Sequence, residues 1–182
     1  DGDDATVLSD MRNAYSTVYT RRTFTADPSS IGGLELTVDY DDGFIVYLNG
    51  PEVARRWAPG VIGEPAPHDA LATASHEASA GPSGNPPEVI DISAHVGLLV
   101  AGDNVIAVQG LNAGLGSGDF SLIVELRPGN AAPQAPRDPL PASGGTGAPT
   151  DTQMCVTVSD ANLDPLEVTF FGHETPAGPS PP

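Results

Sequence analysis

Apolar and polar residues alternate along residues 34–40, which is the period of a β-strand with one buried and one solvent-facing side. The apolar positions are Leu34, Leu36, Val38 and Tyr40, and the polar positions between them are Glu35, Thr37 and Asp39. Residues 44–48 are then almost continuously apolar, which favours a strand covered on both faces. Asn49-Gly50 follows and supplies the positive φ angles of a tight hairpin turn. This segment predicts an antiparallel sheet.

Similar strand patterns recur along the first two thirds of the chain. They lie at residues 15–25, 52–57, 105–109 and 120–126. Turn-forming residues separate them at 27–30, 41–43 and 102–104, and a short helical turn is expected at 91–93. Residues 58–87 are rich in Pro, Gly, Ala and Ser, which predicts a long surface loop. The spacing is typical of an all-β sandwich.

The composition changes after this region. Pro or Gly occupies ten of the 23 positions in residues 128–150, which predicts an extended linker. Residues 154–158 and 166–171 then predict two strands that pair as a hairpin. Because an isolated hairpin is marginally stable in water, this tail needs strands from elsewhere.

The charge of the chain restricts its partners. Seven arginines and no lysine face 24 acidic residues, for a formal net charge of -17. Such a surface repels nucleic acid and anionic lipid, since binding to either depends on neutralising phosphates. No apolar run approaches the roughly twenty residues of a membrane helix, so no membrane insertion is expected. Neutral or cationic partners and metal ions remain.

Three segments carry a resemblance to a known family: VDYDDGFIVYLNGPEVARR, GDNVIAVQGLN and SGDFSLIVEL, preceded by DGDDATVLSDM. They resemble the galactose-binding-like jelly-roll modules of secreted bacterial proteins, over residues 1–127. The resemblance implies a secreted or cell-surface module that binds carbohydrate or surface polymer, often with a structural calcium ion. The tail, VTVSDANLDPLEVTFFG, resembles the opening strands of an immunoglobulin-like or fibronectin-like module, over residues 151–182.

The chain departs from the family pattern at both ends. Family members usually have one or more strands before the DGDD segment, and the second module stops after about two strands. Two alternatives follow. Either the chain is a fragment of a longer protein, or a sheet edge is left uncovered, which a strand from a neighbouring copy could complete.

Clustered carboxylates suggest two calcium sites. Asp1, Asp3 and Asp4 place three carboxylates within four residues, and calcium takes about six to eight oxygen ligands. The alternative is a solvated acidic segment, which we favour because clustering alone does not build a calcium cage.

Asp160, Asn162 and Asp164 copy the first half of an EF-hand spacing. Pro165 stands where that loop needs glycine, and Phe171 where it needs glutamate. An ordinary turn is therefore favoured there.

Carbohydrate binding needs an aromatic face and planar hydrogen-bonding groups beside it. Trp57, the single tryptophan, follows Arg55 and Arg56, and Asn112 and Asp119 flank a glycine-rich loop. These five residues are the candidate carbohydrate site. The competing interpretation, which we favour, packs Trp57 into the sandwich and pairs the arginines with surface carboxylates.

Catalysis has little support in the sequence. The chain has no lysine for a phosphate loop or a Schiff base, and no HExxH or GxSxG motif. His68 and His76 are expected to be solvated loop residues, and Cys155 is expected to be a core thiol.

Three functions follow from these observations. The first is a non-catalytic, extracellular carbohydrate-binding module accessory to a larger protein. The second is a structural subunit of an extracellular filament or adhesive layer, completed by strand exchange. A weaker third is a non-catalytic piece of a secreted hydrolase such as a metallophosphoesterase.

Overall fold

The computed structural model describes residues 6–79, 84–129, 133–146, 149, 151–160 and 165–171. The chain divides into two compact units, Asp1–Ala131 and Ala132–Pro182.

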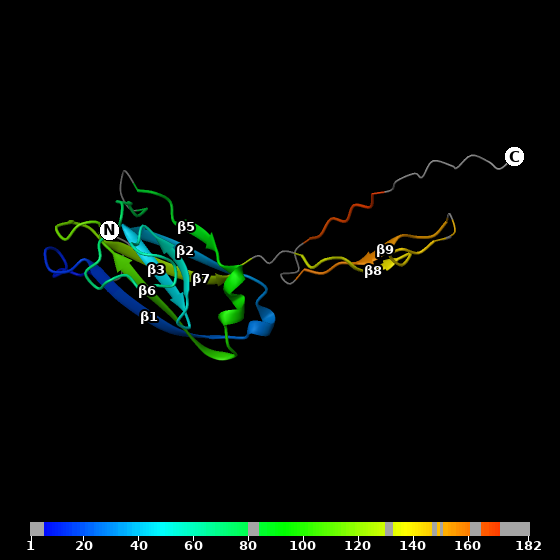
Figure 1. Cartoon of the computed structure of the whole chain (residues 1–182), viewed down its shortest axis with the longest axis horizontal. Coiled ribbons are helices and arrows are strands. Elements are labelled where there is room, and N and C mark those ends of the chain that lie inside the picture. Colours follow the sequence, from blue (N-terminus) through cyan, green and yellow to red (C-terminus); the bar gives the residue numbers. More distant parts are fainter. Residues whose placement is uncertain are drawn as a thin grey trace. The chain divides into compact units, whose positions relative to one another are not determined.

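The first unit contains two antiparallel sheets (Figure 1). The four-stranded sheet has the order β1-β6-β3-β4, with β1 at Thr17–Ala26, β6 at Gly102–Leu111, β3 at Gly43–Leu48 and β4 at Glu52–Arg56. The three-stranded sheet has the order β5-β2-β7, with β5 at Glu88–Asp91, β2 at Leu34–Asp41 and β7 at Ser121–Pro128. Two short 3-10 helices, η1 at Pro28–Ser30 and η2 at Ser93–Leu98, lie in connections. The predicted all-β antiparallel sandwich is confirmed.

The hydrophobic core lies between the two sheets. The alternating residues Leu36, Val38 and Tyr40 of β2 are buried, as are Phe44 and Val46 of β3. Tyr40 and Phe44 meet edge to face, with ring centroids 4.7 Å apart. The alternation seen in the sequence is therefore the core face of β2, and burial of these side chains is the main force that joins the sheets.

Strand β3 is buried on both sides, as its apolar run predicts. Phe44, Val46 and Leu48 face the core between the sheets, whereas Ile45 and Tyr47 belong to a second cluster on the outer face of the four-stranded sheet. Small side chains from the loop after β4 cover this second cluster, namely Ala58, Ala66, Ala70 and Ala72. We call residues 57–79 the covering loop.

The chain enters β3 through a crossover from the other sheet and leaves it through a hairpin turn. Asn49 and Gly50 have φ values of 51° and 108°, and they join β3 to β4 as the predicted tight turn. Asp41 and Asp42, predicted as a reversal, instead carry the chain from one sheet to the other, because β2 and β3 do not pair.

Two further expectations need correction. Residues 102–104, expected to be a turn, already pair with β1. Asn104 is fully buried there, and its side chain bonds the main chain of Val100 and the side chain of Asn49. Strand β5 was not expected at all.

The second unit pairs β8, at Arg137–Leu140, with β9, at Cys155–Thr157. Strand β8 lies inside the segment expected to be a linker, and β9 matches the predicted strand at 154–158. The predicted hairpin with residues 166–171 is wrong, since these residues form no strand and β9 pairs with β8. None of the described residues of the second unit is buried. Cys155, expected in a core, is therefore exposed.

Candidate functional site

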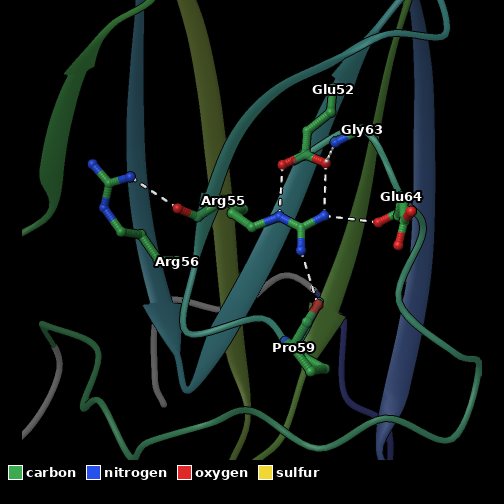
Figure 2. A network of polar contacts seen from close by, with 6 residues as sticks. All are labelled: Glu52, Arg55, Arg56, Pro59, Gly63 and Glu64. Carbon is green, nitrogen blue, oxygen red and sulfur yellow. Dashed lines mark hydrogen bonds and ion pairs between the residues drawn. The ribbon is translucent and has the colours of Figure 1, made fainter. Parts of the chain in front are cut away.

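An ion pair between Glu52 and Arg55 holds the covering loop against the four-stranded sheet (Figure 2). Arg55 Nε lies 2.6 Å from Glu52 Oε1, and Arg55 Nη2 lies 2.7 Å from Glu52 Oε2. The same guanidinium donates to the carbonyl oxygens of Pro59 and Glu64, each at 2.8 Å, and Gly63 N–H donates to Glu52 Oε2 at 2.9 Å. The two side chains are 11% and 2% exposed. The hydrogen bonds that Arg55 donates to Glu52 hold the pKa of Arg55 above its usual value.

Other buried polar groups hold the rest of the loop. Gln109 Nε2 donates to the carbonyl oxygens of Ala66 and Pro67. Asp42 accepts from His76 N–H at 2.9 Å, and Asp39 accepts from both the N–H and the hydroxyl of Ser79. The covering loop is thus an ordered layer, although its composition predicts only irregular surface chain.

His76, expected to be solvated, is half-buried in this layer. Its ring stacks on Tyr40 with centroids 4.0 Å apart and planes 7° apart, and Nδ1 lies 3.0 Å from Tyr40 O. His68 is exposed as expected.

We predict that Arg55→Ala lowers the free energy of unfolding by about 2–4 kcal/mol, because it leaves Glu52 buried and unpaired. Urea denaturation measures the change. Arg22→Ala removes an exposed arginine of β1 and is the matched control, with an expected change within about 0.5 kcal/mol. An equal effect of the two substitutions would contradict the role given to Arg55.

Trp57 begins the covering loop and lies on the surface. Its side chain is 46% exposed. The favoured expectation that Trp57 packs into the sandwich is therefore wrong. The residue has a φ of 50°, and its carbonyl oxygen accepts from both N–H and Oγ1 of Thr73, at 2.6 and 3.0 Å. This left-handed backbone turns the residue out of strand β4, and Thr73 holds it there.

Arg56 and Glu88 lie beside Trp57 and link the edge strands of the two sheets. Arg56 Nη2 and Nε lie 2.5 and 2.8 Å from Glu88 Oε1, with side chains 37% and 34% exposed. Tyr40 Oη donates to Glu88 Oε2 at 3.3 Å. Burial, followed by the charge of Glu88, raises the pKa of Tyr40 to about 12. We call Trp57, Arg56 and Glu88 the Trp57 surface.

Asn112 and Asp119, the other two predicted carbohydrate residues, lie together elsewhere. Asn112 is 4% exposed and donates through Nδ2 to Asp119 O at 3.2 Å. Asp119 is exposed, and its carboxylate accepts from the Ser117 hydroxyl. The five candidates therefore separate into Arg55 inside the ion pair, Arg56 and Trp57 at one surface, and Asn112 with Asp119 at another place.

Asp119 also belongs to a group of three carboxylates. Oxygen atoms of Asp41, Glu77 and Asp119 all lie within 4.8 Å of one another. They come from the end of β2, the covering loop and the segment before β7, so no sequence spacing indicates the group. Burial is the largest cause that raises the pKa of Asp41 to about 7, and the charges of Asp42, Asp119 and Glu77 add to it.

The calcium ion that the family resemblance implies can be tested against these residues. Three carboxylates supply hard oxygen ligands of the kind that calcium takes. Asn112, which contacts Asp119, has a buried Oδ1 with no hydrogen-bond partner. This donor set fits a calcium ion, which would neutralise the mutual repulsion of the three acids. The predicted ligands Asp1, Asp3 and Asp4 lie outside the described residues, as do Asn162 and Asp164.

We predict that, without added divalent cations, the protein becomes less stable as the pH rises through about 7. The folded-state pKa of Asp41 is raised above its usual value, so its contribution to stability is full below about pH 4 and is lost as the carboxyl ionises. Thermal unfolding at pH 5.5 and pH 8 measures the difference.

Asp41→Asn separates this carboxyl from the other groups that titrate in the same range. The variant should lose part of the pH dependence and gain stability at pH 8. An unchanged pH profile in this variant would contradict the assignment.

Comparisons with known proteins give no family for the chain. No family model matches it, and no curated protein matches it significantly. One solved structure that it resembles is the α-L-rhamnosidase of Streptomyces avermitilis in complex with L-rhamnose, at 19% sequence identity and a TM-score of 0.37. The match covers 80% of this chain and 13% of the rhamnosidase chain. Among the described residues, no helix is long and apolar enough to span a bilayer.

Proposed function

We propose that this chain is a non-catalytic, extracellular module that binds a neutral carbohydrate polymer through the Trp57 surface. The observation that carries the proposal is an indole that is 46% exposed on an otherwise ordered residue, beside a half-exposed Arg56–Glu88 pair. The β-sandwich and the resemblance to galactose-binding-like modules support a role of this kind.

The chemistry of the Trp57 surface suits a sugar ring. An exposed indole offers a rigid apolar face with little conformational entropy to lose on binding, and the C–H groups of a pyranose can pack against it. Arg56 and Glu88 offer planar donors and acceptors for hydroxyl groups next to that face. Because Thr73 already holds the main chain of Trp57, little backbone ordering is needed on binding.

The net charge of -17 restricts the kind of glycan. Anionic polysaccharides are repelled over the whole surface. A neutral polymer avoids this repulsion, so the proposed ligand class is uncharged glycans.

We predict saturable binding to at least one neutral glycan on an array, with the affinity measured afterwards by calorimetry. Trp57→Ala should weaken binding by about tenfold or more, since exposed aromatic anchors carry much of the energy of such sites. Trp57→Tyr should retain part of the affinity. Arg56→Gln should weaken binding while it leaves Arg55 and the covering loop in place.

The control for these variants is Ile62→Ala, which removes a side chain that is 79% exposed on the covering loop. It should bind as the unmodified protein does. Absence of binding to every neutral glycan, or binding that Trp57→Ala leaves unchanged, would overturn the proposal.

The proposed module includes a structural calcium ion. Two sets of carboxylates are candidates: Asp1, Asp3 and Asp4, or Asp41, Glu77 and Asp119. We predict that calcium raises Tm, and that the rise grows with the logarithm of the calcium concentration above the dissociation constant, because an ion that binds the folded state alone stabilises it.

Two variants assign the ion to one set. One combines Asp41→Asn with Glu77→Gln, and the other combines Asp1→Asn, Asp3→Asn and Asp4→Asn. The set whose variant no longer responds to calcium holds the ion. A Tm that calcium leaves unchanged in the original protein would exclude both sites.

A further inference from the structure

A groove runs along the side of the sandwich where both sheets end. Strand β1 is the last strand of the four-stranded sheet and β7 the last strand of the three-stranded sheet. Val18 and Thr20 of β1 and Leu122 and Val124 of β7 line the groove, together with Met11 and Phe120. Its volume is about 770 Å³. We call it the edge groove.

Within the part of the chain that the structure describes, the edge groove leaves one side of the hydrophobic core incompletely covered. Leu122, Val124 and Leu126 pack against the core but stay only partly buried. Phe120 and Leu122 approach the opposite sheet closely because Gly110 has no side chain, since a Cβ there would lie 2.7 and 2.9 Å from them. The groove is therefore apolar at its base and bordered on each side by a terminal strand.

An extended peptide with apolar residues at alternate positions fits such a groove. Its main chain can pair with an edge strand while every second side chain enters the groove. A flat or helical partner would leave the main-chain groups of the edge strands without this pairing.

The second unit carries a segment with this pattern. Leu166, Val168 and Phe170 alternate with Glu167 and Thr169. These residues form no strand, and Val168 and Phe170 are 41% and 45% exposed. No described residue of the second unit is buried, so that unit supplies no core against which the segment could pack.

We propose that residues 166–171 of one copy of this chain add a strand in the edge groove of a second copy. The occupant is a second copy because the chain holds both an acceptor groove and a donor segment. Such a contact joins different surfaces of two molecules, so copies can link in an open chain, in a ring or as a reciprocal pair. The inference is independent of the Trp57 surface, which lies on other residues.

The charge of the chain adds a condition. Two molecules of net charge -17 repel each other, and the donor segment contributes one carboxylate, Glu167. Arg12 and Asp119 of the groove lining carry opposite charges. Assembly should therefore strengthen as salt screens the general repulsion.

Light scattering of the full chain after size exclusion tests the inference. The mass should rise with protein concentration and with ionic strength. Phe170→Asp should leave a monomer, because it places a carboxylate in the apolar groove. Thr169→Asp adds the same charge on the opposite side of the segment and should still assemble.

Disulfide trapping tests the contact itself in a Cys155→Ser background. A chain carrying both Thr20→Cys and Val168→Cys, two positions that face the groove, should form linked copies on a non-reducing gel, a dimer for a reciprocal pair or a ladder for an open chain. Neither single cysteine variant should form more than a dimer. Equal volumes of the two single variants should yield mixed dimers.

Three results would overturn the inference. They are a monomer at the highest concentration and salt, loss of assembly by Thr169→Asp as complete as by Phe170→Asp, and a disulfide formed only within one chain. Glycan binding by Phe170→Asp should be unchanged, so a failure here is distinct from a failure of the proposed function.

Discussion

The buried ion pair between Glu52 and Arg55 is the interaction on which the functional surfaces of this protein depend. It fixes the first half of the covering loop by three hydrogen bonds to the main chain, from Arg55 to Pro59 and Glu64 and from Gly63 to Glu52. Trp57 begins this loop, and Glu77 lies near its end. The exposed indole and the carboxylate group are therefore placed by the same layer of chain, although they serve different chemistry.

The covering loop also explains why polar side chains are buried in a small sandwich. Asp39, Asp42 and Gln109 are each at most 7% exposed, and each bonds main-chain groups of the loop. An irregular segment rich in Pro and Ala cannot satisfy its own main-chain groups by pairing, so the sheet supplies side-chain partners for them. Asp41 differs, because its neighbours Asp42, Glu77 and Asp119 are also acids. Their negative charges disfavour ionisation of the Asp41 carboxyl.

Local pattern was sufficient for much of the fold. The alternation at Leu34–Tyr40 and the apolar run at 44–48 predicted β2 and β3, since side-chain period and burial are local consequences of a strand. Local pattern does not reveal the strands and contacts that depend on residues far apart in the sequence. Strand β5 has only four residues and is held by pairing with β2. Gln109 and Ala66 lie 43 residues apart, and no spacing in the sequence relates them.

The residues of the candidate site were likewise predicted only in part. The sequence singled out Trp57 but placed it inside, because large aromatic residues are usually buried; the left-handed backbone at Trp57 reverses that expectation. Arg55 and Arg56 were expected in one site. In the structure, Arg55 binds Glu52 of β4, whereas Arg56 binds Glu88 of β5. The group of Asp41, Glu77 and Asp119 could not be found, since three separate segments form it only after folding.

Amide hydrogen exchange of the covering loop tests this account most directly. If the loop is an ordered layer, the N–H groups of Gly63, Thr73, His76 and Ser79 should exchange far more slowly than those of unstructured chain, because each donates to a partner in the structure. Exchange of these four amides at the rate of an unstructured peptide, while β2 and β3 remain protected, would contradict it.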